Sequence, residues 1–127
     1  MKKLLLLALL LLLSLSACAA SNDAEAAQAV EAYLTALTNQ EPERLVTLSC
    51  ADWEEDALFE LDSFAAVATS LNNLSCQVSG DDGDAKLVTC TGSIQATYGN
   101  EIQQFDLSAR TFRVVNQGGE WLMCGYK

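Results

Sequence analysis

The stretch LVTCTGSIQATY, residues 87–98, alternates apolar and polar side chains with a period of two. Val88, Cys90, Ile94 and Ala96 are its apolar members, and mostly threonine, serine or glutamine stands between them. Such alternation is typical of a β-strand with one buried face and one solvated face. We therefore predict a strand here, inside an antiparallel sheet.

The same period continues on both sides of this strand. Leu74, Cys76 and Val78 alternate with polar residues before it, and apolar positions also recur after it. Turn sequences separate the runs: Asp81-Asp82-Gly83-Asp84, Gly99-Asn100 and Gly118-Gly119. The sequence therefore predicts a meander of four antiparallel strands.

A two-residue turn at Gly99-Asn100 would fix the register of the third strand. The opposed positions are then Tyr98 with Glu101, Ile94 with Phe105, and Cys90 with Ala109. The same parity sends an apolar group outward, namely Phe112, Val114, Trp121 and Met123. Either a bulge within 108–111 swaps the faces, or these side chains contact a second copy or an envelope protein. We favour the bulge. Strict alternation would also place Arg113 in the interior, whereas the bulge places it in water.

The residues before the sheet follow a helical period. From Asn22 onward, apolar side chains recur at Ala26, Val30, Tyr33, Leu34 and Leu37. Pro42 suits the first turn of a second, short helix. A third helix follows Asp52, which forms an acidic capping box with Glu55, and its apolar side carries Trp53, Ala57, Leu58, Leu61 and Phe64. The fold class is α+β, with N-terminal helices against an antiparallel sheet.

Four cysteines lie within the predicted domain: Cys50, Cys76, Cys90 and Cys124. An even number in a chain this small is typical of two disulfides formed in an oxidising compartment. Cys76 and Cys90 occupy opposite inward positions around the first turn of the sheet, so we expect them to pair. Cys50 then remains for Cys124. With no histidine and no Cys-x-x-Cys pair, no metal site is expected.

The N-terminal segment has the pattern of an export signal. A basic start is followed by the ten-residue apolar run 4–13, which is too short to span a bilayer. Leu15-Ser16-Ala17-Cys18 resembles the lipobox of bacterial lipoproteins. This resemblance implies that residues 1–17 are removed and that Cys18 carries lipid, with 18–22 as a short tether and 23–127 as one domain. The protein would face the periplasm or the extracellular side.

The charge balance limits the partners. The chain has 17 acidic and 7 basic side chains, for a net charge of −10. Such an acidic surface does not suit nucleic acid or adsorption on anionic lipid. We therefore expect membrane contact only through the lipid on Cys18.

The element order, ending in GGEWLMCGYK at 118–127, resembles the nuclear transport factor 2-like superfamily. It is also similar to small bacterial lipoproteins of unknown function that carry such a domain. The resemblance covers about residues 23–127 and implies a cone, in which a strongly bent four-stranded sheet wraps the first helix and can leave a pocket at its open end. Members include isomerases, dehydratases, carrier-like binders and association modules, so this fold does not select a function.

The candidate pocket residues are Tyr33, Phe105, Tyr126 and Arg113. No inward strand position carries a carboxylate, since Asp106 alternates outward and Asp62 lies on the solvent side of its helix. We expect no catalytic residue and no cofactor, and predict a lipid-anchored, non-enzymatic cell-envelope protein that binds a small apolar ligand or mediates assembly.

Two other functions stay open. One is a small isomerase- or dehydratase-like enzyme acting on an apolar substrate, and the other is a purely structural envelope module. A carboxylate beside a tyrosine hydroxyl in a deep pocket would favour the enzyme, and one buried in the cone within hydrogen-bonding reach of that hydroxyl would overturn the non-enzymatic prediction. A filled cone with an exposed patch at Trp121 and Met123 would favour assembly.

Overall fold

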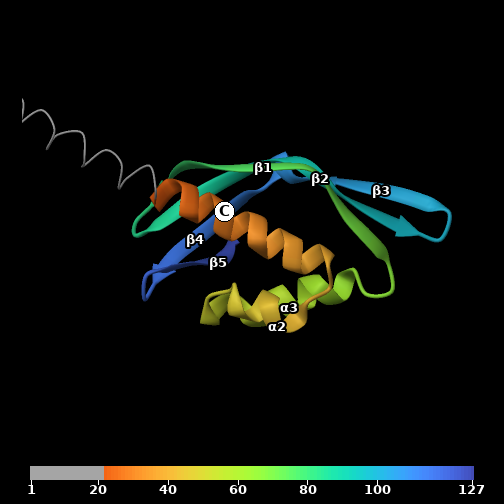
Figure 1. The fold of residues 1–127 in the computed structure, drawn as a ribbon, viewed down its shortest axis with the longest axis horizontal. Helices are drawn as coiled ribbons and strands as arrows, with labels where there is room; N and C mark the ends of the chain where they lie inside the picture. The colour runs from red at the N-terminus through yellow and green to blue at the C-terminus, as the bar shows by residue number, and fades with distance from the viewer. Residues whose placement is uncertain (1–21) are drawn as a thin grey trace, which may run out of the picture.

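The computed structural model describes residues 22–127 as helices followed by an antiparallel sheet (Figure 1). The helical part contains a first helix at 22–38, then α2 (Pro42–Thr47), the 3-10 turn η1 (Ala51–Trp53) and α3 (Glu54–Ser63). The sheet contains β1 (Ala68–Asp82), β2 (Ala85–Tyr98), β3 (Glu101–Asp106), β4 (Thr111–Gln117) and β5 (Glu120–Tyr126), with the 3-10 turn η2 (Leu107–Ala109) between β3 and β4. The predicted α+β class is confirmed.

The helices begin and end close to the predicted positions. The first helix buries the expected apolar side chains: Ala26, Val30, Tyr33, Leu34 and Leu37. Pro42 occupies the first turn of α2, where its missing N–H leaves no hydrogen bond unmade. The predicted capping box is wrong, because η1 precedes α3 and no side chain caps the α3 N-terminus.

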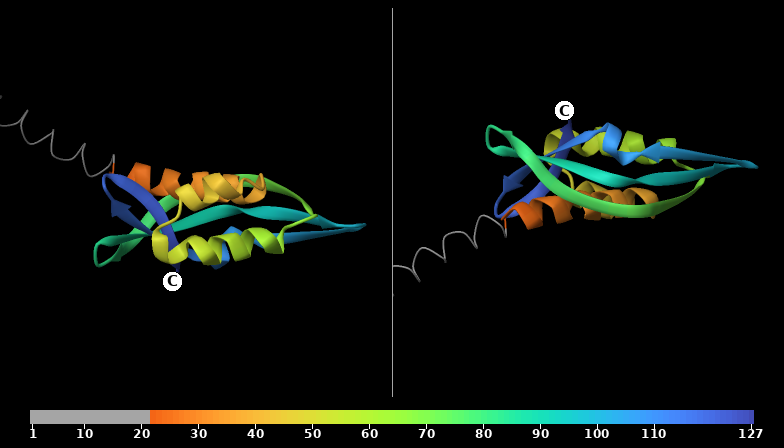
Figure 2. Two further views of the ribbon diagram at one scale, coloured as in Figure 1. Left: turned by 90° about the horizontal axis from the view of Figure 1, so that it is seen from below. Right: turned by 90° about the horizontal axis from the view of Figure 1, so that it is seen from above.

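Strand β2 is the centre of the sheet. It pairs with β1 along one edge, while β3 and β4 share its other edge and β5 pairs with β4. The predicted pairs Tyr98–Glu101 and Ile94–Phe105 are confirmed. The sheet curves around the first helix, and the β2–β3 hairpin projects beyond it (Figure 2).

The predicted third strand is interrupted, so the sheet has five strands rather than four. Ala109 lies in η2 and does not pair with Cys90. Beyond η2 the register has moved by one residue, because Val88 now lies opposite Phe112. One extra residue turns every following side chain to the other face of the sheet. The predicted face swap is therefore confirmed.

This swap determines which side chains of β4 and β5 face the core. Phe112, Val114 and Met123 are buried in the core, and Trp121 is partly buried. The alternative in which these side chains contact a partner is thus wrong for the three buried ones. Arg113 faces out and forms an ion pair with Asp82 at 3.2 Å.

A second irregularity bends β1. The register shifts between Asn72 and Ser75, and Asn73 adopts a positive φ of 53°. Opposite it, Gly92 has a φ of 100°, and a Cβ at Gly92 would lie 2.5 Å from the Asn72 carbonyl oxygen. Only glycine permits this close approach of the two backbones.

The two disulfides form between the predicted cysteines. Cys76 and Cys90 lie directly opposite on β1 and β2, with Cα atoms 4.1 Å apart. Cys50 joins Cys124 of β5 across 74 residues of sequence. Disulfides of this kind indicate an oxidising compartment outside the cytoplasm.

The lipobox-like segment with Cys18 and the predicted signal peptide lie outside the described residues. Within 22–127, no helix is long and apolar enough to cross a membrane.

Candidate functional site

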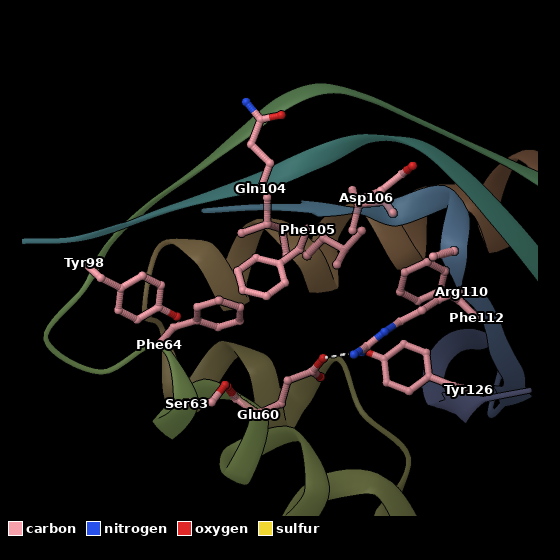
Figure 3. A pocket seen from close by; sticks show the side chains of 14 residues that line it. Glu60, Ser63, Phe64, Tyr98, Gln104, Phe105, Asp106, Arg110, Phe112 and Tyr126 are labelled. Atoms are coloured by element: carbon pink, nitrogen blue, oxygen red, sulfur yellow. Dashed lines mark hydrogen bonds and ion pairs between the residues drawn. The ribbon is translucent and has the colours of Figure 1, made fainter. Parts of the chain in front are cut away.

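A cavity of about 590 Å³ lies between α3, the β2–β3 hairpin and the end of β5 (Figure 3). Its volume falls within the usual range of small-molecule sites, about 300–1,000 Å³. Most of its lining is apolar or aromatic, and the residues are Leu34, Glu60, Ser63, Phe64, Ile94, Tyr98, Gln104, Phe105, Asp106, Leu107, Ala109, Arg110, Phe112 and Tyr126. The cavity has one polar corner, formed by Glu60, Arg110 and Tyr126.

Glu60 is the centre of this corner, and its side chain is 18% exposed. The Tyr33 hydroxyl donates to Oε2 at 2.8 Å, and the Tyr126 hydroxyl donates to Oε1. Arg110 Nη1 also donates to Oε1, at 3.4 Å. Trp53 Nε1 donates in turn to the Tyr33 hydroxyl at 3.1 Å. These bonds fix the carboxylate against the edge of the core.

The helical period explains why Glu60 faces inward. It lies three residues after Ala57 and four before Phe64, and both of these are buried. Residues at these spacings share one face of a helix. The expectation that the cavity holds no carboxylate is therefore wrong: the strands supply none that points inward, but α3 does. Attention to Glu60 on the apolar side of the third helix would have found it.

The two tyrosines are strongly perturbed by this arrangement. Burial, together with the neighbouring Glu60 carboxylate, raises the pKa of Tyr33 well above its usual value. The same two causes, in the same order, raise the pKa of Tyr126. Both phenols therefore keep their protons and act as hydrogen-bond donors to Glu60 across the physiological pH range.

Arg110 closes the polar corner from the segment between η2 and β4. Its side chain is 57% exposed, and the guanidinium lies over the Tyr126 ring, 4.7 Å from the ring centroid. An arginine has five N–H donors, and only one of them is directed at Glu60 here. The corner thus holds one negative and one positive side chain beside an aromatic ring.

The structure places the predicted pocket residues in three different settings. Phe105 and Tyr126 line the cavity, whereas Tyr33 lies behind Glu60 and is buried. Arg113 is outside the cavity, in its ion pair with Asp82. Asp106 borders the cavity, but its carboxylate accepts from Ser108 and points away (Figure 3). Asp62 is exposed.

The residues that sequence analysis missed are Glu60 and Arg110. No periodic signal marks Arg110, because it follows the interruption between β3 and β4. Over residues 22–127, no group of His, Cys, Asp and Glu side chains is arranged to hold a metal ion.

The comparisons with known proteins concern the fold. No protein-family model and no curated protein matches the chain. Among solved structures, an LEH-like epoxide hydrolase of M. tuberculosis is similar with a TM-score of 0.50 and 18% identity, over 84% of this chain and 85% of that chain. A designed nuclear transport factor 2-like protein is similar with a TM-score of 0.44 and 10% identity, over 76% of this chain and 91% of that chain. The chain has the nuclear transport factor 2-like fold.

Proposed function

We propose that this protein is a lipid-anchored envelope protein whose domain binds a small, mainly apolar molecule. The observation that carries the proposal is the 590 Å³ cavity, in which apolar and aromatic side chains surround a single polar corner. Pockets of this composition bind ligands through buried apolar area and orient them with a few polar groups. The anchor is the lipid expected on Cys18, and several acyl chains together make such an anchor durable.

The binding function is tested by filling the cavity from an exposed position. Ala109 lines the cavity and is exposed on η2, so Ala109→Trp introduces bulk with little disturbance of the core. The matched control is Ala51→Trp, on the exposed turn η1 outside the cavity. Ligand-observed NMR of the full chain in lipid nanodiscs, with 3-phenylpropanamide as probe, should detect binding to wild type and to Ala51→Trp but not to Ala109→Trp. Equal signals from all three proteins would contradict the proposal.

The anchor is tested separately. Growth with an alkyne-tagged fatty acid should label the wild-type protein, and Cys18→Ser should remove the label. Mass spectrometry of the native N-terminus should show a diacylglyceryl cysteine. An unlabelled wild-type protein, recovered soluble with a free Cys18, would contradict the lipid anchor.

The position of Glu60 favours a second candidate function, a small enzyme. A carboxylate beside two tyrosine hydroxyls in a pocket meets the condition set above for that alternative. Glu60 would act as a general base for an attacking water, and an epoxide is a substrate of suitable size and polarity. By its name, the similar M. tuberculosis protein hydrolyses epoxides. We rank this function second because the Glu60 side chain is 18% exposed and its oxygens already accept from three donors of the protein, so an attacking water would have to compete with them.

An activity assay separates the two functions. Incubation with styrene oxide should give no diol above the uncatalysed rate if the domain only binds. Diol formation that wild type supports and Glu60→Gln abolishes would replace the binding function with the hydrolase.

A further inference from the structure

We propose that Glu60 and Arg110 select a neutral ligand whose head group both donates and accepts a hydrogen bond, such as an alcohol or a primary amide. This inference rests on the proposed binding function and names the class of ligand for the same cavity.

The charges inside the cavity cancel. Of the described residues that line it, Glu60, Asp106 and Arg110 carry charge, and the Asp106 carboxylate points away toward Ser108 (Figure 3). Glu60 and Arg110 face each other across 3.4 Å. An anionic head group placed here would lie close to the Glu60 carboxylate, and a cationic one close to the Arg110 guanidinium. At such distances, in a partly desolvated site, either repulsion is substantial.

The polar corner also has both a free hydrogen-bond acceptor and free hydrogen-bond donors. A carboxylate has about four acceptor positions. Glu60 Oε2 accepts from Tyr33 alone, whereas Oε1 already accepts from both Tyr126 and Arg110. Oε2 therefore still has room for a donor from the ligand. Arg110 directs one N–H at Glu60 and has further N–H groups for an acceptor. A hydroxyl or an amide satisfies both sides at once, and an apolar body then extends toward Phe64 and Phe105.

The hydrogen bonds within the polar corner limit how far it can rearrange to accept a charged head group. Both tyrosine hydroxyls donate to Glu60, so turning either of them toward an anionic ligand would cost the carboxylate one of its hydrogen bonds. The Arg110 guanidinium is held over the Tyr126 ring. The cavity can therefore change its charge preference only if Glu60 or Arg110 is changed.

The test compares three probes with similar bodies and different head groups. These are 3-phenylpropanamide (neutral), 3-phenylpropanoate (anionic) and 2-phenylethylammonium (cationic). Their affinities are measured at pH 7 by isothermal titration calorimetry on the full chain in nanodiscs of uncharged lipid. Wild type should bind the amide about tenfold more tightly than either ion.

Variants should move this preference in opposite directions. Glu60→Gln leaves a net positive cavity and should improve binding of the anionic probe about tenfold, whereas Arg110→Gln leaves a net negative cavity and should favour the cationic probe by a similar factor. The control is Arg44→Gln, because Arg44 is exposed on α2 and outside the cavity. This control should keep the wild-type order. If Glu60→Gln does not fold, Arg110→Gln carries the test, since its side chain is largely exposed.

The outcomes separate the inference from the proposed function. Equal binding of an ion and the amide by wild type, or an unchanged order in Arg110→Gln, would overturn the inference while the binding function stands. Failure of all three probes to bind wild type would overturn both.

Discussion

The two ends of the sheet differ in how completely they are packed. Around β4 and β5, side chains such as Phe112, Val114 and Met123 are fully buried, and the Cys50–Cys124 bond ties β5 to the helical part. At the other end, all six residues of β3 are exposed and the β2–β3 hairpin projects from the body (Figure 2). The cavity lies where the packed end meets the open one. The difference indicates that one end supplies stability while the other leaves room for a ligand.

The largest effect should follow from opening the packed end. Replacing Cys50 and Cys124 together by alanine releases a loop of 74 residues, so the chain-entropy model predicts a loss of about 4–5 kcal/mol. Replacing Cys76 and Cys90, which close a loop of 14, should remove about 3 kcal/mol. Urea unfolding measures both. A larger loss from the shorter loop would reverse the ranking of the two bonds.

A pair of phenylalanines compares the two ends with the same substitution. Phe112→Ala should lower the free energy of unfolding by about 3–5 kcal/mol, because Phe112 is 1% exposed. Phe105→Ala should lower it by only about 1 kcal/mol, since Phe105 is 39% exposed and loses mainly its edge contact with Phe64. Thermal unfolding of the two variants checks the difference. Similar losses would show that β3 contributes as much as β4.

Tyr33, at the boundary between the two ends, should make the unfolding free energy depend on pH at high pH. Folding raises the pKa of Tyr33 above the unfolded value of about 10, so its contribution to stability is complete below that pH and decreases above it. The decrease is at most about 1.4 kcal/mol per pH unit for one such group. Tyr33→Phe should flatten the pH dependence of the unfolding free energy between pH 9 and 11. A pH dependence in Tyr33→Phe as steep as that of wild type would contradict the assignment.

The smallest effect belongs to the tip of the open end. Ile102 is 61% exposed, so Ile102→Lys should change the free energy of unfolding by less than about 0.5 kcal/mol. Sedimentation of the variant should match wild type. A loss of more than about 1 kcal/mol, with a change in sedimentation, would mean that β3 is covered in solution.

Sequence periodicity predicted the two hairpins that flank β2 better than the connection from β3 to β4. Alternation along 87–98 predicted β2, the turn sequences on either side predicted both neighbouring turns, and the opposed positions of Cys76 and Cys90 predicted their bond. These features depend on local spacing, which a period of two determines. The bulge was predicted from the apolar side chains that strict parity would have exposed, and Phe112 opposite Val88 confirms it.

The polar corner depends on contacts between distant segments. The corner forms only because α3 packs near the β3–β4 connection and the end of β5, which brings Glu60 to Arg110 and Tyr126. Spacing along the chain does not predict that these three residues are close together. The interruption at η2 was predicted only in part. A bulge was expected there, but the 3-10 turn and the loss of the Cys90–Ala109 pair were not. A carboxylate on the apolar side of a helix was the one local signal of the site.

The two disulfides also impose an order on biosynthesis. An exported chain that crosses the membrane from its N-terminus brings Cys50, Cys76 and Cys90 into the oxidising compartment before Cys124, so there is an interval before the partner of Cys50 arrives. During that interval the Cys50 thiol is present together with both sheet cysteines and is open to exchange with them. Pairing of Cys76 with Cys90 in the first sheet hairpin would remove this competition before Cys124 arrives. Correct cross-linking of the chain thus depends on how quickly one hairpin forms.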